Sequence, residues 1–600
     1  MNRVSRHPMR RILAAGVVLL MLVGWFVLRL VDIQVVRAAE LNEASQDVRS
    51  RDQTIYGERG EILDATGAVL AETVVRYDIA LSPKQAMLGR VTREEPDPDD
   101  PSSTRTVEVP LDQVLAELGE VIGRTGEELR TQIDTALAAD PDDDFEYAAR
   151  HVDTATYEAV KALGIPWVEP YIQPGRRYPN GAVAGNLLGF TNADGEPVAG
   201  LELSEDQCLA AENGTMRSLR SLTDWVTIPG SEQVIEESHD GGDLQLTIDA
   251  DLQYFVQRVA AEQVAAVQAD WATVTVMEAK TGRLLAVADV PTVDPNSPTS
   301  VDSQDRGSRA FTAPFEPGST FKSLTSASVI DAGEATPTSR VTAPYRYEPD
   351  GADITDSFGH DPERWTMTGM LIVSSNTGMS MFGERLSDAE RYDYMRAFGL
   401  GSPTEVGFAS EAAGDLNYDG GWPDSQTRYA TMFGQGLTTT AVQIASAYQA
   451  IANGGVRKPV TLVDGCRMPD GTLEGEPATE GRRVISEAAA QETTDMLERV
   501  YEDAWVSDLW EIPGYRVAAK TGTAQFSDGD GYEAGYLVSV AGFAPADDPE
   551  FVVSVSIKNP VKMNSSAAAA PVFQQVMSQV LKKYRTVPSG APAPELPANW

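Results

Sequence analysis

The chain carries the segment Glu316-Pro317-Gly318-Ser319-Thr320-Phe321-Lys322 directly before a run in which Leu324 and Ala327 are apolar. Apolar residues at this spacing predict a helix that begins at or beside Ser319. Three residues are close to one helical turn, so Ser319 and Lys322 would share a face, with the lysine amine near the serine hydroxyl. The free N–H groups at the start of the helix would favour a developing oxyanion. Ser319 is therefore a candidate nucleophile.

Lysine can act as the base for such a serine if its pKa falls from ~10.4 toward ~7–8, which burial or a second cation can achieve. No other serine stands three residues before a lysine, and only 10 of the 48 basic residues are lysine. Because arginine supplies most of the positive charge, Lys322 suits a task that needs deprotonation. Taken alone, the segment could also be a surface lysine beside a helix-capping serine.

A second polar motif, Ser374-Ser375-Asn376, follows the apolar residues Met370 to Val373. A hydroxyl and a carboxamide two residues apart on a loop can point the same way. The hydroxyl could then relay a proton, and the amide could hold both a substrate and the lysine. The alternative for this motif alone is an ordinary polar turn.

A third motif, Lys520-Thr521-Gly522-Thr523, stands at the end of the apolar strand predicted over Val517 to Ala519. Glycine within a strand indicates close approach by another backbone, such as that of a ligand, and Lys520 with Thr521 could bind a carboxylate. The chain also contains Lys280-Thr281-Gly282, but this copy precedes Ser319 and falls in a predicted hairpin turn, where glycine permits positive φ. We interpret the earlier copy as structural.

The composition bounds the remaining possibilities. A chain of 600 residues with 42% hydrophobic composition can bury a large core and divides into two or more domains. A net charge of -41 repels nucleic acid, and the acidic runs Glu94 to Asp100 and Asp140 to Asp144 resemble solvated loops, so no metal is predicted. Four histidines and no Gly-x-Ser-x-Gly argue against a histidine-based hydrolase. Whether Cys208 and Cys466 pair stays open.

The amino terminus predicts a membrane anchor. Residues Ile12 to Leu28 carry no charge, and Arg29 can snorkel so that the span extends to Val31. Arginines precede this run, so the positive-inside rule places residues 1–11 in the cytoplasm, a transmembrane helix over residues 12–31, and the remaining chain outside. A cleaved signal peptide is the alternative, although the apolar run is long and no clear Ala-x-Ala site follows.

Two extracytoplasmic domains are predicted, the first over residues 32–240 and the second over residues 241–585, with a disordered tail at residues 586–600 that is rich in Pro and Ala. The first domain is an extended α+β region, with helices expected at Leu111 to Ile122 and Thr154 to Leu163. The second is an α/β domain. Its expected elements are a helix over Asp251 to Gln268, a hairpin of Val274 to Met277 with Leu284 to Val287, strands over Arg516 to Thr523, Leu537 to Phe543 and Phe551 to Ile557, and a helix over Pro571 to Tyr584.

The order Ser-x-x-Lys, Ser-x-Asn, Lys-Thr-Gly is the signature of penicillin-binding proteins and class A β-lactamases. Over nearly its whole length the sequence resembles the class B penicillin-binding proteins. Beyond the three motifs, the resemblance rests on Arg59 to Asp64, Gly67 to Ala71, Arg177 to Pro179, Gly200 to Glu202, Thr247 to Asp249 and Gly434 to Gly436. It implies a single transmembrane helix, a pedestal or dimerisation domain, and a β-lactamase-like transpeptidase domain with an antiparallel sheet flanked by helices.

The resemblance also implies a peptidoglycan D,D-transpeptidase without metal or cofactor. Ser319 would attack the D-Ala-D-Ala carbonyl of a stem peptide, release D-Ala and form an acyl-enzyme that an amine resolves; β-lactams would acylate the same serine. Lys322 would be the base, Ser374 would relay the proton, and Asn376 would orient Lys322 and the substrate. Lys520, Thr521 and Gly522 would hold the terminal carboxylate side. The N–H groups of Ser319 and Thr523 would form the oxyanion hole.

The runs Phe433 to Thr438 and Glu316 to Gly318 look more like division-type (septal) members than elongation-type members. The implied partners are a glycosyltransferase of the SEDS family (FtsW-like) and membrane proteins of the divisome, in the cytoplasmic membrane of a bacterium. A β-lactam sensor and a β-lactamase are weaker alternatives. The class A deacylating pattern Glu-x-x-Leu-Asn has Ala413 at the Glu position before Leu416-Asn417, which favours transfer to an amine over hydrolysis.

Overall fold

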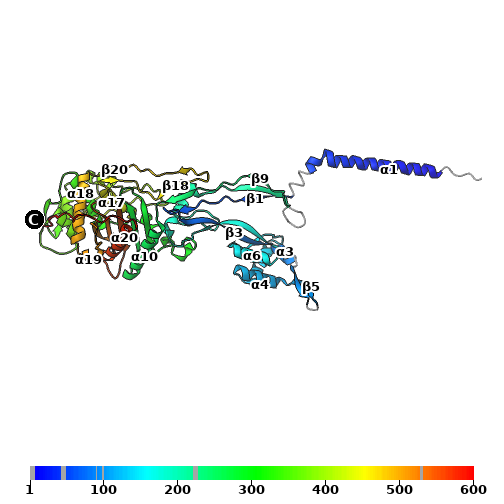
Figure 1. The fold of residues 1–600 in the computed structure, drawn as a ribbon, viewed down its shortest axis with the longest axis horizontal. Coiled ribbons are helices and arrows are strands. Elements are labelled where there is room, and N and C mark those ends of the chain that lie inside the picture. Colours follow the sequence, from blue (N-terminus) through cyan, green and yellow to red (C-terminus); the bar gives the residue numbers. More distant parts are fainter. Residues whose placement is uncertain (1–6, 42–48, 89–90, 98–99, 220–227, 528–531) are drawn as a thin grey trace, which may run out of the picture. The chain divides into compact units, whose positions relative to one another are not determined.

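The structure is a computed structural model that describes residues 7–41, 49–88, 91–97, 100–219, 228–527 and 532–600. The chain divides into two compact units, and Figure 1 draws the whole chain in the colours of the sequence. One comprises residues 1–58 with 211–240, and the other comprises residues 59–210 with 241–600.

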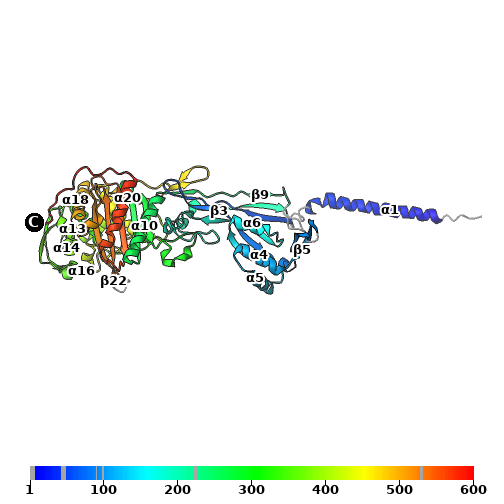
Figure 2. The same ribbon diagram turned by 60° about the horizontal axis from the view of Figure 1, so that its bottom comes forward.

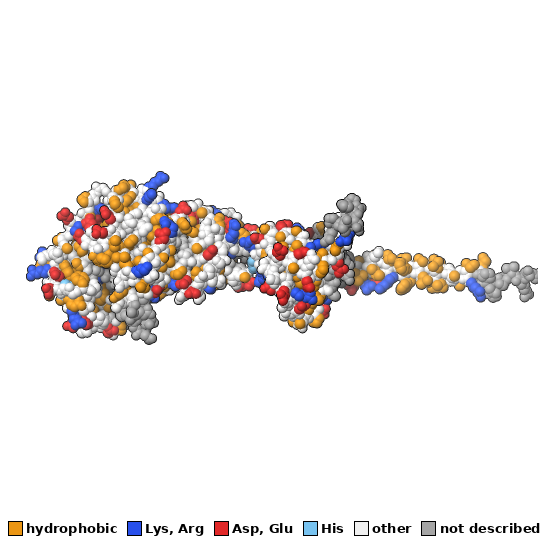
Figure 3. Space-filling model, turned by 90° about the horizontal axis from the view of Figure 1, so that it is seen from below, with side chains coloured by type: hydrophobic (Ala, Val, Ile, Leu, Met, Phe, Trp, Pro, Cys, Tyr) orange, Lys and Arg blue, Asp and Glu red, His pale blue; other side chains and the backbone are white. Residues whose placement is uncertain are grey.

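The first unit contains the apolar amino-terminal helix. Helix α1 spans His7–Val31 and is followed by one π-helical turn, Asp32–Val36. The stretch Met9–Val36 is long and apolar enough to cross a membrane, and none of it is buried in the structure. Figure 3 shows hydrophobic side chains over the surface of this helix. The same unit has a three-stranded antiparallel sheet of β1 (Ser50–Ile55), β8 (Gly214–Leu219) and β9 (Gln233–Glu236).

The second unit is centred on a five-stranded antiparallel sheet (Figures 1 and 2). Its strand order is β12 (Leu284–Val290), β11 (Trp271–Glu278), β23 (Phe551–Lys558), β22 (Tyr532–Ala544) and β21 (Ala518–Ser527). Helices α10 (Ala250–Val267) and α20 (Ala570–Lys583) pack on one face, and α17 (Ala441–Ala452) and α18 (Glu487–Asp503) cover the other. Because both faces are covered, the central strands β11 and β23 are buried almost throughout, and small Thr or Ser side chains alternate there with apolar ones.

These elements confirm the α/β class and the predicted order of helices and strands. The spacing of Leu252, Val256 and Val259 buries one face of α10 against the sheet, and Asp249 caps the helix by accepting from the Leu252 N–H. The hairpin β11–β12 turns at Gly282, whose φ is +81°, so the earlier Lys-Thr-Gly copy lies in a turn as expected.

Residues 59–210 contribute strands to a second, seven-stranded sheet that also includes segments of the carboxyl-terminal half. Strand β10 (Asp243–Leu246) pairs with β2 (Ile62–Leu63) on one side and with β18 (Val463–Arg467) on the other. The long strand β3 (Val69–Leu81) continues the sheet toward β6 (Glu146–Val152) and β7 (Val168–Arg177). Helices α4 (Leu111–Ile122), α5 (Gly126–Ala139) and α6 (Thr154–Ala162) pack there around a separate apolar core.

A buried carboxylate explains several of the sequence positions that resemble the class B proteins. The Glu202 side chain is fully buried, and its two oxygens accept from Arg59 Nε and Arg176 Nε, each at 2.7 Å. The Tyr178 hydroxyl donates to the same carboxylate at 3.2 Å. Removing one partner would leave a charge uncompensated in the interior, so these residues act as a set.

A disulfide settles the question that the sequence left open. Cys208 in α9 (Asp206–Leu209) and Cys466 in β18 are bonded, and the two residues are 258 positions apart in the chain. The bond ties the region around residues 206–209 to the sheet of the carboxyl-terminal half.

We expect the double variant Cys208→Ala/Cys466→Ala to lose about 2–5 kcal/mol of unfolding free energy, because the cross-link closes a long loop and restricts the unfolded chain. Thermal denaturation of the full chain in detergent, with and without reductant, measures this. The wild type should fall to the midpoint of the variant when reduced, whereas the variant should not respond to reductant. An equal midpoint for oxidised wild type and variant would contradict the expectation.

The prediction of a disordered tail at residues 586–600 is wrong. The Ala598 carbonyl accepts from the Thr366 N–H at 3.0 Å, and the Trp600 indole donates to the Val341 carbonyl at 3.2 Å. A Cβ at Gly369 would lie 1.8 Å from the Ala598 oxygen, so this glycine makes room for the tail. Composition predicted disorder because Pro and Ala bury little surface, but the backbone groups and the terminal tryptophan provide the contacts.

Candidate active site

Ser319 lies where the sequence predicts a helix start. A short 3-10 turn, Gly318–Phe321, leads into the buried helix α12 (Lys322–Asp331). Gly318 has φ +57°, donates its N–H to the Gly434 carbonyl at 2.9 Å, and would place a Cβ 3.0 Å from the Ala524 Cβ. Glycine at this position therefore lets the turn that carries Ser319 lie against strand β21. Ser319 is half-buried, and none of the hydrogen bonds among the described residues engages its hydroxyl.

Lys322 is completely buried one turn beyond Ser319. Its Nζ donates to Asn376 Oδ1 at 2.7 Å and to the Ser374 carbonyl at 2.5 Å, and it lies 3.4 Å from Ser374 Oγ. Burial lowers the pKa of Lys322 to about 7, although the nearby Asp356 carboxylate opposes the shift. An amine with this pKa is partly neutral near neutral pH and can accept a proton.

The Ser374-Ser375-Asn376 motif forms the junction of two helices. Helix α13 (Met367–Val373) ends at Ser374, which adopts the left-handed conformation with φ +60°. Ser375 then caps α14 (Asn376–Gly383) by accepting from the Gly378 N–H. The junction aims the Asn376 amide at Lys322 and brings the Ser374 hydroxyl to Lys520, as the two-residue spacing predicts.

A second buried lysine completes the cluster. Lys520 Nζ donates to Ser374 Oγ at 3.0 Å, so this hydroxyl lies between the amines of Lys520 and Lys322. Burial, and secondarily the charge of Lys322, lowers the pKa of Lys520 well below its usual value. Two ammonium groups so close together in a buried site repel each other, which favours a neutral form of one of them.

The Lys520-Thr521-Gly522 motif lies within strand β21 rather than at its end, because the strand continues to Ser527. β21 is the edge strand of the five-stranded sheet and packs against the turn that carries Ser319. At Gly522 a Cβ would meet Ser539 Oγ at 2.3 Å and the Pro317 oxygen at 3.0 Å. Within the protein, the Ser539 hydroxyl and the Pro317 carbonyl both approach this glycine closely, and the approach of a ligand stays a prediction.

We expect Gly522→Ala to lower the rate of acylation by a fluorescent penicillin at least about tenfold, because a displacement of only ~1 Å in a reacting group has large kinetic effects. The added methyl would displace the Ser539 hydroxyl and would press on the Pro317 oxygen, two residues before Ser319. The neighbouring strand position Ala524→Gly removes bulk instead and serves as the matched control. Equal rates for wild type and Gly522→Ala would show that the turn tolerates the shift.

The remaining predicted residues line one cleft of about 970 Å³. Its walls include Ser319, Ser374, Asn376, Thr521, Gly522 and Thr523. The two lysines lie buried behind these groups. Trp505, which is 67% exposed, also lines the cleft. Sequence reasoning missed this tryptophan, which belongs to no motif.

Sequence reasoning also missed Asp356. This buried carboxylate accepts from the N–H groups of Asn376 and Thr377 and from the Ser375 hydroxyl, and so supports the start of α14. Asp356 stands in an ordinary polar loop 20 residues before Asn376, and nothing in the sequence marks that loop as a neighbour of the motif.

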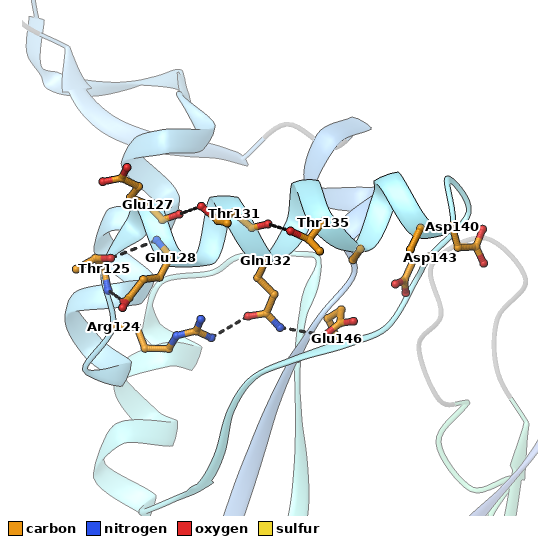
Figure 4. A pocket seen from close by; sticks show the side chains of 12 residues that line it. Arg124, Thr125, Glu127, Glu128, Thr131, Gln132, Thr135, Asp140, Asp143 and Glu146 are labelled. Carbon is orange, nitrogen blue, oxygen red and sulfur yellow. Dashed lines mark hydrogen bonds between the residues drawn. The ribbon is translucent and has the colours of Figure 1, made fainter.

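A second pocket, of about 820 Å³, lies along α5 and contains none of the predicted site residues (Figure 4). Gln132 at its centre donates to Glu146 at 3.0 Å and accepts from Arg124 at 2.8 Å. Gln132 therefore bridges Arg124 and Glu146. Among the described residues, no group of three or more His, Cys, Asp or Glu could hold a metal ion.

Comparison with known families identifies the family to which the chain belongs. Residues 272–578 match the penicillin-binding protein transpeptidase domain, and residues 54–246 match the penicillin-binding protein dimerisation domain. The chain is a class B penicillin-binding protein. The second match accounts for the membrane-proximal region that a β-lactamase would leave unexplained.

Similar proteins agree over almost the whole length. The chain is 32% identical to penicillin-binding protein PbpB of Mycolicibacterium smegmatis, covering 99% of this chain and 92% of that protein. It is 30% identical to peptidoglycan D,D-transpeptidase FtsI of Escherichia coli, covering 90% and 86%. The crystal structure of penicillin-binding protein 3 from Mycobacterium tuberculosis complexed with aztreonam has a TM-score of 0.67 at 26% identity, covering 91% of this chain and all of that one. The predicted family, fold and serine D,D-transpeptidase class are confirmed.

Proposed function

We propose that Ser319 is the nucleophile of this peptidoglycan D,D-transpeptidase and that Lys322 is its general base. The observation that carries the proposal is the position of Lys322, buried one turn from Ser319, with a pKa of about 7 and its amine fixed by Asn376. A general base must be neutral to accept a proton, and burial favours the neutral amine. Burial of Lys322 therefore suits a base better than a purely structural residue.

The proposed reaction uses these groups in sequence. Lys322 accepts the Ser319 hydroxyl proton as the oxygen attacks the penultimate D-Ala carbonyl of a stem peptide. The N–H groups of Ser319 and Thr523 stabilise the oxyanion, a contribution of about 3 kcal/mol per donor in other acyl-transferases. The proton passes through Ser374 to the leaving amine, and D-Ala departs. An amine of a second stem peptide then attacks the ester, restores the serine and forms the cross-link.

The carboxylate of the terminal D-Ala would lie against β21. Thr521 and Thr523 offer hydroxyl groups on the cleft wall, and the Lys520 amine lies buried behind them, where its protonated form would attract the carboxylate. A β-lactam presents a reactive carbonyl and a negatively charged group in a similar arrangement. The related M. tuberculosis protein forms a complex with aztreonam, and we infer that this chain is acylated by β-lactams at the same serine.

Mass spectrometry tests the assignment. After incubation of the full chain with penicillin and digestion, the adduct should map to the peptide that contains Ser319; an adduct on another serine would overturn the proposal. With a D-Ala-D-Ala stem peptide and an acceptor amine, the protein should release D-Ala and form a peptide dimer. Labelling without release of D-Ala would identify a sensor, and free hydrolysed peptide without dimer would identify a hydrolase.

We also propose a septal role, with an FtsW-like SEDS glycosyltransferase and divisome membrane proteins as partners. The relatives at about 30% identity include FtsI, the type that the motifs around Ser319 and Phe433 resemble. A fluorescent fusion should concentrate at the division site and co-purify with such a glycosyltransferase. Uniform labelling of the lateral wall would identify the elongation type instead.

The proposed topology places the amino terminus in the cytoplasm and the cleft outside the cytoplasmic membrane. Arg10 and Arg11 precede the apolar part of α1, as the positive-inside rule requires. The Cys208–Cys466 disulfide agrees with an oxidising compartment. Protease added to spheroplasts should remove the domain that carries Ser319 and spare an amino-terminal tag; protection of that domain would refute the topology.

A further inference from the structure

His360 is a nearly buried histidine next to the active-site cluster, and the proposed mechanism does not use it. Its side chain is 7% exposed. The ring atom Nε2 lies 2.9 Å from Asp356 Oδ2, and Nδ1 lies 2.7 Å from the Asp361 carbonyl oxygen. Both ring nitrogens therefore face oxygens that can only accept.

A neutral imidazole has one N–H and could satisfy only one of these two oxygens, whereas the imidazolium donates to both. The pKa of His360 is raised, as expected for a ring that donates from both nitrogens. Burial lowers the pKa, but the hydrogen bonds to the Asp361 carbonyl and Asp356 and the charges of Asp356 and Glu363 outweigh it, so the net shift is upward. The rings of Tyr345, Phe358 and Trp365 also lie against His360.

Asp356 connects this histidine to the catalytic motif. Its Oδ1 accepts from the N–H groups of Asn376 and Thr377, and its Oδ2 accepts from the Ser375 hydroxyl as well as from His360. The Asn376 side chain in turn holds Lys322 at 2.7 Å. One carboxylate thus receives bonds both from the turn that orients the base and from the histidine, and its Oδ2 accepts from both.

The carboxylate also acts on Lys322 through its charge. Asp356 stabilises the ammonium form of Lys322 and so opposes the release of its proton. A positive imidazolium 2.9 Å from the carboxylate offsets part of this effect. Loss of the imidazolium charge would leave Asp356 free to raise the proton affinity of Lys322.

We propose that His360, as an imidazolium, is a positioning residue of the transpeptidase site: through Asp356 it holds the Ser374–Asn376 turn and keeps the Lys322 amine available as a base. The inference rests on the proposed role of Lys322. His360 would act on the Ser374–Asn376 turn through Asp356 and would not touch the substrate.

The test is the pH profile of acylation by a fluorescent penicillin, measured with the full chain in detergent for the wild type, His360→Gln and His360→Arg. Glutamine can donate to Asp356 but carries no charge, and arginine keeps the charge at every pH and can extend toward solvent. The exposed His239 gives the matched control, His239→Gln.

His360→Gln should move the midpoint of the rising limb upward by about half to one pH unit, which lowers the rate about 2–5-fold at pH 7 and about 3–10-fold well below the midpoint. His360→Arg and His239→Gln should keep the midpoint of the wild type. A purely structural role would lower the plateau without moving the midpoint, and that result, or a profile of His360→Gln that superimposes on the wild type, overturns the inference. If either variant fails to fold, the other decides; if both fail, His360 is structural and the inference is wrong.

An inactive wild type would instead count against the proposed function. The two failures are distinguishable because acylation of the wild type is measured in the same series.

Discussion

Ser319→Ala is expected to abolish covalent labelling by fluorescent penicillin and release of D-Ala, while the protein stays folded. The hydroxyl oxygen forms the ester, so no acyl-enzyme can form without it. Only the effects of binding and of the oxyanion hole remain. Ser319 is half-buried, and the hydrogen bonds of the described residues do not include its hydroxyl. The substitution should therefore change the unfolding free energy by less than about 0.5 kcal/mol.

The matched control is Ser578→Ala, a serine on α20 outside the cleft, which should label like the wild type. Labelling is read on a gel after denaturation, so that only a covalent adduct counts. The thermal midpoint of Ser319→Ala, measured without penicillin, shows whether the fold is intact. Undiminished labelling of a folded Ser319→Ala protein would refute the assignment of the nucleophile.

The catalytic residues could be predicted from sequence because their relations are local. Ser319 and Lys322 are one helical turn apart, and Ser374 and Asn376 are separated by one residue, so secondary structure alone brings each pair onto one side. Only the order of the motifs and the family resemblance predicted that these two pairs meet at Lys520. The distance between Lys520 and Ser374 is set by the packing of β21 against the helices, which no short segment encodes.

The residues that were missed are held by distant contacts. Asp356 and His360 lie in a polar loop whose neighbours are determined by tertiary packing, and neither belongs to a periodic pattern. Trp600 was assigned to a disordered tail because proline-rich composition dominates its surroundings, yet its indole finds the Val341 carbonyl. The pairing of Cys208 with Cys466 was undecidable because cysteine spacing this long has no pattern.

The anchor and the domain cores were better predicted, since both follow from long runs of composition or periodicity. Helix α1 covers the expected span, and α4 has the predicted bounds, Leu111–Ile122. The boundary between the two compact units could not be predicted from the sequence. Residues 59–210 form one compact unit with residues 241–600, because β2 and β10 pair in a single sheet.

Lys322→Met is expected to lower the rate of acylation about 10²–10⁴-fold, the usual contribution of a general base. In the wild type the rate should rise about tenfold per pH unit below about pH 7, where Lys322 loses its proton, and level off above it. In Lys322→Met this limb should disappear. Lys458→Met, which removes a lysine on the outside of the domain, should keep both the rate and the limb.

The same variant should be more stable than the wild type at neutral pH. Burial lowers the pKa of Lys322 to about 7 in the folded protein, whereas the unfolded chain keeps the usual value near ~10.4. The unfolded state therefore binds more protons between these pH values, and the stability of the wild type rises with pH over that range. The cost of burying the amine is greatest below pH 7 and vanishes above the unfolded pKa. Methionine avoids that cost, but it leaves Asn376 Oδ1 and the Ser374 carbonyl without their donor.

We therefore expect a net gain of about 1–3 kcal/mol for Lys322→Met at pH 7, less than the full desolvation cost because two acceptors lose their partner. Thermal midpoints of both proteins at pH 7 and pH 10 test this. The advantage of the variant should shrink at pH 10. At that pH the wild-type amine is neutral in the folded state and partly neutral in the unfolded state, so its deprotonation costs less free energy. A variant less stable than the wild type at pH 7 would mean that the hydrogen bonds of Lys322 outweigh its desolvation. An inactive but more stable protein would instead show that the buried base is kept for catalysis at the expense of the fold.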